Sequence, residues 1–581
     1  MDTIATAENP LVLRPGDVRV IDFGPDGTGG YASFDVLSFT GKPVLRIAYA
    51  THPDGLGEKG DFWFETRATY LGEEVILPIL PASPNRFDLF TIDHTGAYSA
   101  PLLQGLVRYA RITVEASSSG SAKLSGFRFE NRGTHSEEEV IGSFTCSDER
   151  LNGIWKASVQ TCKMASIPAR EKPLRIVADG VETVLGPTYA YISDGAKRDR
   201  LVWSGDLWWA GLNMYYAFGP KSPFMAGSLR MLAENQTPEG YVQACPYPES
   251  HGPLKTGDDG PFQSDEFAAW LVPVAYDYWM YTGDVQLLAA LLPALERLMD
   301  YLERNCRADG LFEQRPETSK NAGALRFGAE SLNHRSYMNV LLLGCYRMMA
   351  ELVGDPARAA HYTAKAENLS NAIWQNFALT DGGLCKSLED KAYDREATAL
   401  LHALHGCADT PYPHGKYACI WHAKFQAAAI HAMFESGLAE EAVAAVFDHN
   451  WAKLLDPDWK GMRTTYECMH MNTSGWGDEA HPDTAIAGLF SRYLLGIAPT
   501  APGFAEFTFR PMRTSTVTSA SGSVPTPRGQ IHASWSYTDG KWAVDVTVPK
   551  GLRGWLLLPD RAPVELKSGI HGQSVLRPDR P

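Results

Sequence analysis

The sequence has 581 residues, of which 44% are hydrophobic and 21% charged, and a net charge of −15 at neutral pH. This length and composition are typical of a globular protein with several domains and a core large enough to fold without disulfide or metal staples. The acidic balance disfavours nucleic-acid binding, because such proteins contact phosphates through basic patches.

Residues 1–140 are predicted to form an N-terminal β-sandwich. Short apolar or alternating runs recur between turns rich in Gly, Pro, Asp and Ser, a pattern typical of antiparallel strands. The Gly-rich stretch 24–30 lies among these runs without a following helix, so it is not interpreted as a phosphate-binding loop. The runs are Val18–Phe23, Val44–Tyr49, Phe87–Ile92, Val107–Val114 and Ala122–Phe129.

Residues 141–497 show the hydrophobic period of helices, first at Leu151, Ile154, Trp155 and Val159. Eleven or twelve helices joined by turns with Pro and Gly fit a closed ring of helical hairpins, an (α/α)6 barrel. A helical solenoid is the alternative, but the sequence has no fixed-period repeat. The later helices are expected at about 202–217, 222–234, 264–282, 285–305, 331–353, 356–377, 395–405, 418–436, 438–449 and 483–495.

Residues 498–581 return to the strand pattern, which predicts a second, smaller β-sandwich. The chain is thus predicted to be a multidomain α+β protein, with a central (α/α)6 barrel between N-terminal and C-terminal β-sandwich domains. The C-terminal runs are Phe504–Phe509, Gly529–Trp535, Trp542–Val548 and Gly554–Leu558.

Three features of the whole chain predict a soluble, cytoplasmic protein. The nine cysteines form no Cys-x-x-Cys pair and no metal-ligand spacing, so they are interpreted as reduced thiols. The N-terminal residues lack the basic and apolar regions of a signal peptide, and no apolar run reaches the length of about 18 residues that spans a membrane. We expect no metal, no cofactor, no membrane contact and no nucleic-acid partner. The sequence leaves the oligomeric state open.

The segment 194–206 concentrates charge immediately before an apolar helix. Asp194, Asp199 and Asp206 are accompanied there by Arg198 and Arg200. Carboxylates gathered at the mouth of a barrel push their pKa values apart, so that one becomes an acid and another a base. A structural salt-bridge network at a helix N-terminus would have the same composition.

A second polar segment lies at 464–482. Glu467 is a lone carboxylate among polar and aromatic residues, and Trp476 and His481 follow it in a loop before the helix expected from Asp483. Such loops on a rigid scaffold commonly form sites, although a surface loop with Asp483 as a helix cap has the same pattern.

Paired carboxylates are the basic requirement for glycoside hydrolysis, in which an acid protonates the leaving oxygen and a base activates water. The sequence has no Gly-x-Ser-x-Gly, Walker A or His-Glu-x-x-His motif that would indicate another chemistry. Four histidines, His422, His431, His470 and His481, share no metal-ligand spacing.

At these residues the sequence resembles the α-L-rhamnosidases of glycoside hydrolase family 78 and their six-hairpin relatives. Thr464–Glu467 resembles the segment that carries the second catalytic glutamate, and weaker matches at 22–24, 493–511 and 519–529 occur in the family's order. The family pattern Asp-Cys-Pro-x-Arg-(Asp/Glu)-x-x-x-Trp-x-Gly-Asp is matched by Asp194, Arg198, Asp199, Trp203, Gly205 and Asp206.

The resemblance implies an inverting enzyme that hydrolyses terminal α-L-rhamnosyl residues of an oligosaccharide or glycoside. It implies that Asp199 is the general acid and Glu467 the general base, with carboxyl groups about 6.5–9.5 Å apart. The residues that it implies for sugar binding are Asp194, Arg198, Trp203, Asp206, Trp208, Trp476 and His481.

The sequence also departs from the family, which leaves two alternatives open. Gly195-Ala196 replaces Cys-Pro, and Asp199 stands where Glu is usual, so the chain resembles a minimal, divergent member. Six-hairpin relatives include lyases that remove rhamnose from α-1,4-linked glucuronate by β-elimination. There Lys197, Arg198 or Arg200 would neutralise the uronate, and a His or Tyr would take the C5 proton. The other alternative is a non-catalytic carbohydrate-binding protein.

Overall fold

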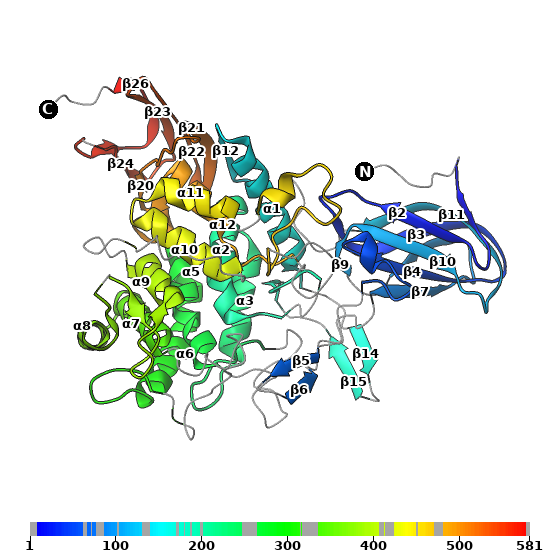
Figure 1. The fold of residues 1–581 in the computed structure, drawn as a ribbon, viewed down its shortest axis with the longest axis horizontal. Coiled ribbons are helices and arrows are strands. Elements are labelled where there is room, and N and C mark those ends of the chain that lie inside the picture. The colour runs from blue at the N-terminus through cyan, green and yellow to red at the C-terminus, as the bar shows by residue number, and fades with distance from the viewer. Residues whose placement is uncertain are drawn as a thin grey trace.

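The structure is a computed structural model of a mixed α+β protein. The N-terminal strands lie on one side of a large group of helices, and the C-terminal strands lie at another end of it (Figure 1). The described residues are 9–61, 67–70, 73–76, 86–100, 104–130, 140–169, 174–178, 181–185, 189–197, 201–246, 264–313, 315, 335–380, 382–405, 412, 423–448, 451–469, 480–559 and 561–576.

Two antiparallel sheets make up the N-terminal part, and their inward side chains form one hydrophobic core around Phe34, Ile47 and Ile112. Successive side chains of a strand point to opposite faces, so Phe90 is buried in this core while Leu89 beside it is exposed. One sheet has the order β1(Leu11–Leu13)-β11(Ser119–Glu130)-β3(Thr28–Lys42)-β8(Gly96–Ser99), with β9(Gln104–Val107) also on β3. The other has the order β2(Val18–Asp22)-β10(Tyr109–Val114)-β4(Val44–Ala50)-β7(Phe87–Thr91).

The predicted strand runs of this region are confirmed, but β3, its longest strand, was not among them. β3 pairs with three strands along its length, and its pairing with β11 is interrupted by register shifts. Three glycines, one of them in its Thr-Gly-Lys end, weaken the alternation of apolar and polar residues in its sequence. Tertiary pairing therefore decides this strand, because glycine has low strand propensity by itself.

The helices predicted from hydrophobic periodicity are confirmed within the described residues, with two differences. Trp270 divides the helix expected at 264–282 in two, and the helix expected at 483–495 begins only at Ile486. The bounds are α1 Glu149–Ala165, α2 Ser204–Ala217, α3 Pro223–Glu234, α4 Asp265–Ala269, α5 Leu271–Thr282, α6 Val285–Arg304, α7 Arg335–Leu352, α8 Pro356–Phe377, α9 Arg395–His405, α10 Ala423–Glu435, α11 Ala439–Asp448 and α12 Ile486–Leu489, which a π-helical turn extends over Phe490–Leu495.

Local signals fix several of these helix ends. Gly283, with a φ of 67°, ends α5 in the left-handed conformation that glycine adopts without strain. The side chain of Asp284 then accepts hydrogen bonds from the backbone N–H groups of Gln286 and Leu287, which caps α6. This turn joins two antiparallel helices as one hairpin.

α2 is a deeply placed helix, because every one of its residues is buried. It contacts α1, α5 and α12. At Gly488 of α12 an added Cβ would lie 2.7 Å from the backbone of Leu212, so α2 and α12 approach backbone to backbone. The N-terminal turn of α2 carries Asp206 and is thereby held in a rigid setting.

Two further sheets form the C-terminal part, and their core is continuous with that of the helices. The indole N–H of Trp535 donates to the carbonyl of Leu494, 2.8 Å away in the helical part. One sheet has the order β12(Ser143–Cys146)-β21(Ser519–Thr526)-β22(Gly529–Thr538)-β23(Lys541–Val548)-β26(Gly569–Leu576). The other has the order β19(Ile497–Pro499)-β20(Glu506–Phe509)-β24(Arg553–Leu556)-β25(Val564–Leu566).

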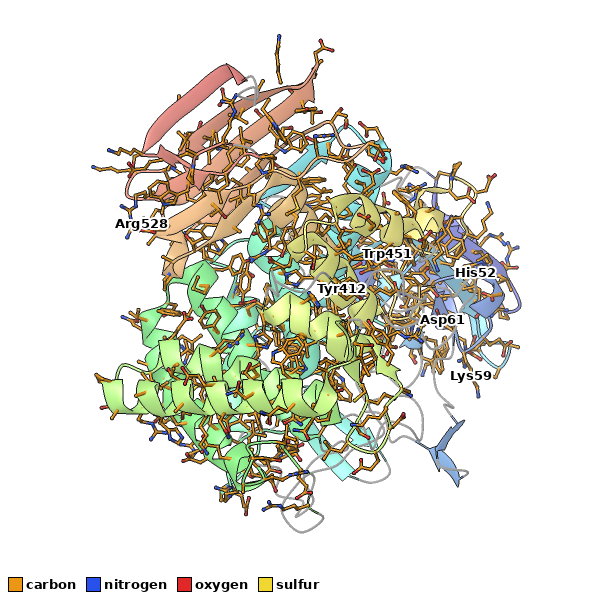
Figure 2. All side chains as sticks on the ribbon, turned by 60° about the vertical axis from the view of Figure 1, so that its left-hand side comes forward. His52, Lys59, Asp61, Tyr412, Trp451 and Arg528 are labelled. Atoms are coloured by element: carbon orange, nitrogen blue, oxygen red, sulfur yellow. The ribbon has the colours of Figure 1, made fainter. Side chains whose placement is uncertain are left out.

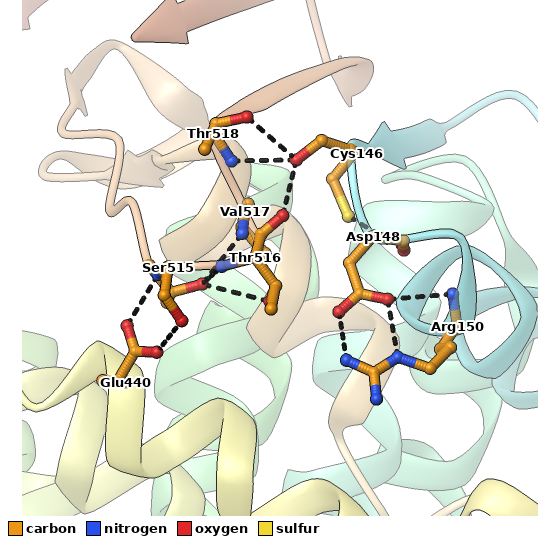
Figure 3. A network of polar contacts seen from close by, with 10 residues as sticks. Cys146, Asp148, Arg150, Glu440, Ser515, Thr516, Val517 and Thr518 are labelled. Atoms are coloured by element: carbon orange, nitrogen blue, oxygen red, sulfur yellow. Dashed lines mark hydrogen bonds and ion pairs between the residues drawn. The ribbon is translucent and has the colours of Figure 1, made fainter. Parts of the chain in front are cut away.

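β12 precedes the first helix in the chain but belongs to the C-terminal sheet, where it pairs with β21. The contact continues beyond the strands. The hydroxyl of Ser147 donates to the carbonyl of Thr516, and Glu440 of α11 accepts the N–H of Ser515, each at 2.8 Å (Figure 3). The helical part and the C-terminal sheets are therefore tied together at two separate places.

Small two-stranded sheets complete the described structure. They pair β5(Arg67–Tyr70) with β6(Glu73–Ile76), β13(Ser166–Ile167) with β16(Tyr191–Ile192), β14(Leu174–Ala178) with β15(Val181–Leu185), and β17(Leu384–Cys385) with β18(Tyr393–Asp394). The cysteines within the described ranges are free thiols. Among the described helices, none is both long and apolar enough to cross a bilayer.

Candidate active site

Backbone hydrogen bonds bring together the two sequence segments that were predicted to carry the chemistry. The N–H of Ala196 donates to the carbonyl of Ala480 at 3.1 Å, and the N–H of His481 donates to the carbonyl of Thr465 at 2.8 Å. The N–H of Ala423, at the start of α10, donates to the carbonyl of Glu467 at 2.8 Å. The loop from Asp194, the strand-like segment before Glu467 and the start of α10 thus adjoin one another.

Asp206 stands in the first turn of α2, where the helix dipole favours a carboxylate. Its Oδ1 accepts from Nζ of Lys424, the second residue of α10, at 3.2 Å. Both residues are buried. Burial acts to lower the pKa of Lys424, but Asp206, Asp483 and Glu266 outweigh it and raise this pKa above its ordinary value. Lys424 is therefore a fixed cation among carboxylates.

His481 and Asp483 form a second buried charged pair, with 2.5 Å between Nδ1 and Oδ1. Burial acts to lower the pKa of His481. The carboxylates of Asp483, Glu467 and Asp206 overcome this and raise it well above its ordinary value. These carboxylates, Glu467 among them, therefore favour the imidazolium form of the ring. Glu467 itself is 6% exposed.

One group of acidic and histidine side chains among the described residues has the geometry to hold a metal ion. The ligand atoms of Asp206, His481 and Asp483 lie within 4.8 Å of one another. Lys424 lies against Asp206, and the surrounding carboxylates favour the protonated form of the imidazole, which has no lone pair to offer a metal. The arrangement suits proton transfer and hydroxyl binding better than metal coordination.

Asp194 closes the loop that carries the centre of the charged motif. Its Oδ1 accepts the N–H of Leu201 at 3.0 Å, and its own N–H donates to the carbonyl of Leu201 at 2.9 Å. The ends of the loop are therefore joined across the motif. Three of the predicted site residues, Arg198, Asp199 and Trp476, lie outside the described residues.

The two predicted tryptophans within the described residues have different surroundings. Trp203 immediately precedes α2 and packs edge-on against Phe267, with 5.5 Å between ring centroids. Trp208 packs instead against Trp209, Trp270 and His431. It lines a cavity of about 160 Å³ whose lining includes Asp277 and Arg492, and no other predicted site residue within the described part of the chain.

Sequence reasoning missed Lys424 and gave Asp483 a different role. α12 begins at Ile486 after Ala485, so Asp483 is not its N-cap and bonds to His481 instead. The alternative in which Asp483 caps this helix is therefore ruled out, because a turn separates Asp483 from α12. A lysine at the start of the Ala-rich α10, whose residues are buried up to Phe434, was the available signal for Lys424, since an unpaired buried lysine is rare.

Two protein-family models match the chain. The bacterial α-L-rhamnosidase 6 hairpin glycosidase domain matches residues 175–415, and the bacterial α-L-rhamnosidase C-terminal domain matches residues 496–573. Together they cover more than half of the chain. The first range contains the charged motif 194–206, whereas Glu467 and His481 lie between the two ranges.

Curated relatives match at low identity. The α-L-rhamnosidase of Alteromonas sp. (strain LOR) is 25% identical over 390 residues, which cover 61% of this chain and 40% of the relative. That of Streptomyces avermitilis is 23% identical over 434 residues, which cover 66% of this chain and 37% of the relative. The chain therefore spans about two fifths of the length of the curated relatives that it matches.

Solved structures support the fold. The α-L-rhamnosidase from Dictyoglumus thermophilum has a TM-score of 0.68 at 14% identity, over 96% of this chain and 63% of that one. A rhamnosidase from Klebsiella oxytoca with rhamnose bound has a TM-score of 0.60 at 18% identity, over 83% of this chain and 88% of that one. Since both domain models match, and together cover more than half of the sequence, the chain belongs to the bacterial α-L-rhamnosidase family, with a six-hairpin glycosidase domain.

Proposed function

We propose that the protein hydrolyses a terminal α-L-rhamnosyl residue of an oligosaccharide or glycoside with inversion at the anomeric carbon. The observation that carries the proposal is the buried group formed by Asp206, Lys424, Glu467, His481 and Asp483, with Ala196 of the charged motif bonded to the adjoining Ala480. Three carboxylates and two cations in one buried place are costly for folding alone, which favours a catalytic role.

In the proposed reaction Asp199 is the general acid and Glu467 the general base. The Asp199 proton goes to the glycosidic oxygen as its bond to the anomeric carbon breaks. Glu467 takes a proton from a water molecule, which attacks the anomeric carbon from the opposite face and forms β-L-rhamnose. Distances of about 6.5–9.5 Å between the two carboxyl groups are expected for this outcome.

The neighbouring groups would bind and orient the sugar. Asp206 accepts from rhamnose hydroxyls while Lys424 holds its carboxylate in place, and the imidazolium of His481 donates to a hydroxyl next to Glu467. Asp194, Arg198, Trp203 and Trp476 complete the proposed set from the resemblance. Trp208 is proposed for the set as well, although its ring packs in the aromatic cluster with Trp209 and Trp270.

The finer architecture belongs to the same proposal. We propose that the helices close into an (α/α)6 barrel at 141–497, between β-sandwiches at 1–140 and 498–581. The helical hairpins and the two pairs of sheets support this arrangement. The pairing of β12 with β21 means that residues 143–146 would belong to the C-terminal sandwich by structure.

β-Elimination from a rhamnosyl-glucuronate is the rival reaction. It needs a cation that is available for the uronate, and Lys197, one of the three cations considered for it, is instead held in a buried ion pair with Asp61. Lys197 is therefore not available to neutralise a uronate, and the other two cations, Arg198 and Arg200, lie outside the described residues.

The test uses a panel of α-L-rhamnosides that includes rhamnosyl-α-1,4-glucuronate. We expect proton NMR to show β-L-rhamnose as the first product, with no new ultraviolet absorbance from an unsaturated uronate. Glu467→Gln and Asp199→Asn should each lower kcat by at least about 100-fold, since acid–base groups contribute about 10²–10⁴-fold. The exposed Asp93→Asn is the matched control and should retain activity. α-L-Rhamnose as first product, absorbance growth, or full activity of both variants would contradict the proposal.

A further inference from the structure

Lys197, which stands two positions before Asp199, forms an ion pair with the N-terminal part of the chain. Its Nζ lies 3.1 Å from Oδ2 of Asp61, and the two side chains are 1% and 2% exposed. Asp61 follows strand β4 in the N-terminal part of the chain and lies where the N-terminal sheets meet the helical part (Figure 2). A residue of the catalytic motif is thus held by the N-terminal domain.

Asp61 is surrounded by donors that fix both of its oxygens. Nε of Arg86 donates to Oδ1 at 3.1 Å, and the N–H and hydroxyl of Thr51 donate to Oδ2 at 2.8 and 2.9 Å. Arg86 is itself held by Gln104 of β9 at 3.1 Å. Burial acts to raise the pKa of Asp61, but Lys197 and Arg86 hold it below its ordinary value, so the carboxylate stays charged.

The backbone of the motif loop also rests on β9. An added Cβ on Gly105 would lie only 1.5 Å from the carbonyl oxygen of Ala196, so β9 contacts the loop backbone directly. Leu106, the next residue, belongs to the hydrophobic core of the helices, whereas Val107 belongs to the N-terminal core. β9 therefore joins the two domains at the position where the loop passes.

The two domains do not need the Asp61–Lys197 pair or the Gly105 contact in order to stay together, because they are also joined elsewhere. Arg108 donates to the carbonyls of Trp459 and Gly461 at 2.9 and 2.6 Å, and the hydroxyl of Tyr109 donates to the carbonyl of Lys460 at 3.1 Å. Among the described residues, the Asp61–Lys197 pair and the Gly105 contact instead reach the motif segment itself, from the N-terminal side. A buried lysine also has a large desolvation cost, which a simple contact would not need.

We propose that Asp61 and Gly105 of the N-terminal domain are positioning residues, which act through Lys197 and Ala196 to hold the loop segment that presents the general acid Asp199. The inference rests on the proposed function. It assigns the N-terminal domain a part in catalysis, through the alignment of one proton donor.

The test uses leaving groups of different acidity, because a misplaced acid slows departure of a poor leaving group and matters little for a good one. We compare methyl α-L-rhamnoside with p-nitrophenyl α-L-rhamnoside in the full-length protein. Lys197→Met should lower kcat for the methyl glycoside by about 10–100-fold, in line with the effect of a displacement near 1 Å. The fold-decrease in kcat for the p-nitrophenyl glycoside should be at least about ten times smaller than that for the methyl glycoside. KM should be unchanged for both substrates.

Two variants and one control complete the design. Lys197→Arg keeps a cation beside Asp61 and should retain most of the activity that Lys197→Met loses. Gly105→Ala pushes the loop without removing a charge and should give the same leaving-group pattern, so it also carries the test if Lys197→Met does not fold. Tyr109→Phe removes an interdomain hydrogen bond away from the loop and should behave like wild type.

The outcomes separate the inference from the function that it rests on. If the wild-type protein cleaves neither rhamnoside, the proposed function fails. If the wild-type protein is active and the folded variants lose activity equally on both substrates, or lose none, the positioning role of Asp61 and Gly105 is wrong. Loss confined to the methyl glycoside supports it.

Discussion

At the scale of single residues, the site is defined by charge compensation in a buried place. Lys424 is the second residue of α10, where the positive end of the helix dipole disfavours a cation. The carboxylates of Asp206, Asp483 and Glu266 reverse this and raise its pKa. An isolated buried charge costs several kcal/mol, roughly, so each member of the group depends on the others.

The His481–Asp483 pair is expected to stabilise the protein in a pH-dependent way. Because the pKa of His481 is raised in the folded state, its stabilisation is complete below about 6.5, the ordinary histidine pKa, and disappears as pH rises through the raised value. Asp483→Asn should therefore lower the free energy of unfolding by about 3–5 kcal/mol at pH 6, and by less at alkaline pH. Urea unfolding at several pH values measures this difference.

His52 and Asp54 provide the matched control, because they form a His–Asp pair with the same spacing and a similar distance of 2.6 Å at the surface. Solvent screens this pair, so Asp54→Asn should cost at most about 1 kcal/mol. A loss for Asp483→Asn that does not change with pH would show that His481 is not the titrating partner.

At the scale of elements, the starts of several helices deliver the charged groups. Asp206 and Glu266 stand in the first turns of α2 and α4, and Lys424 in that of α10. The segment that carries His481 and Asp483 leads into α12, which packs backbone to backbone on α2. The relative position of α2 and α12 therefore sets the distance between Asp206 and the His481–Asp483 pair.

Gly488→Ala should disturb this distance. Its new methyl group would meet the backbone and side chain of Leu212 at 2.7 Å, and overpacking of this kind costs about 1–3 kcal/mol. We expect a lower free energy of unfolding together with a fall in kcat/KM, measured by urea unfolding and by rhamnoside hydrolysis. Gly354→Ala, where an added Cβ meets nothing within 4 Å, should change neither quantity. Unchanged activity of a destabilised Gly488→Ala variant would argue against the geometric link.

At the scale of the whole molecule, the hydrophobic cores define which parts unfold together. One core runs from the helices into the C-terminal sheets, through residues such as Phe490, Leu494 and Trp535, whereas the N-terminal sheets enclose a core of their own. The pairing of β12 with β21 strengthens the connection between the helices and the C-terminal sheets. We therefore expect the helices and the C-terminal sheets to unfold as one cooperative unit.

Calorimetry with one substitution in each core tests this expectation. Trp535→Ala should cost about 3–5 kcal/mol and lower the temperature at which rhamnosidase activity is lost. Phe34→Ala in the N-terminal core has a similar cost, but should first lower the transition of the N-terminal sheets. Loss of activity in Trp535→Ala only well above the new transition would contradict a shared unit.

The sequence by itself determined the helices, most of the strands, the charged motif and the family, because these depend on local periodicity and on neighbours in the chain. Asp284 could be predicted as a cap for this reason, and the structure confirms it. The motif also indicated Asp206, since a carboxylate in the first turn of a helix is locally favourable.

Only the tertiary structure decided which charges meet. Lys424 and Asp206 are 218 positions apart, Lys197 pairs with Asp61 from another domain, and β12 joins a sheet whose other strands follow residue 518. Such pairings are set by packing of elements distant in sequence, and no local pattern encodes them. The same physical limit explains Asp483, whose role as the partner of His481 rather than as a helix cap depends on where the turn before α12 places it.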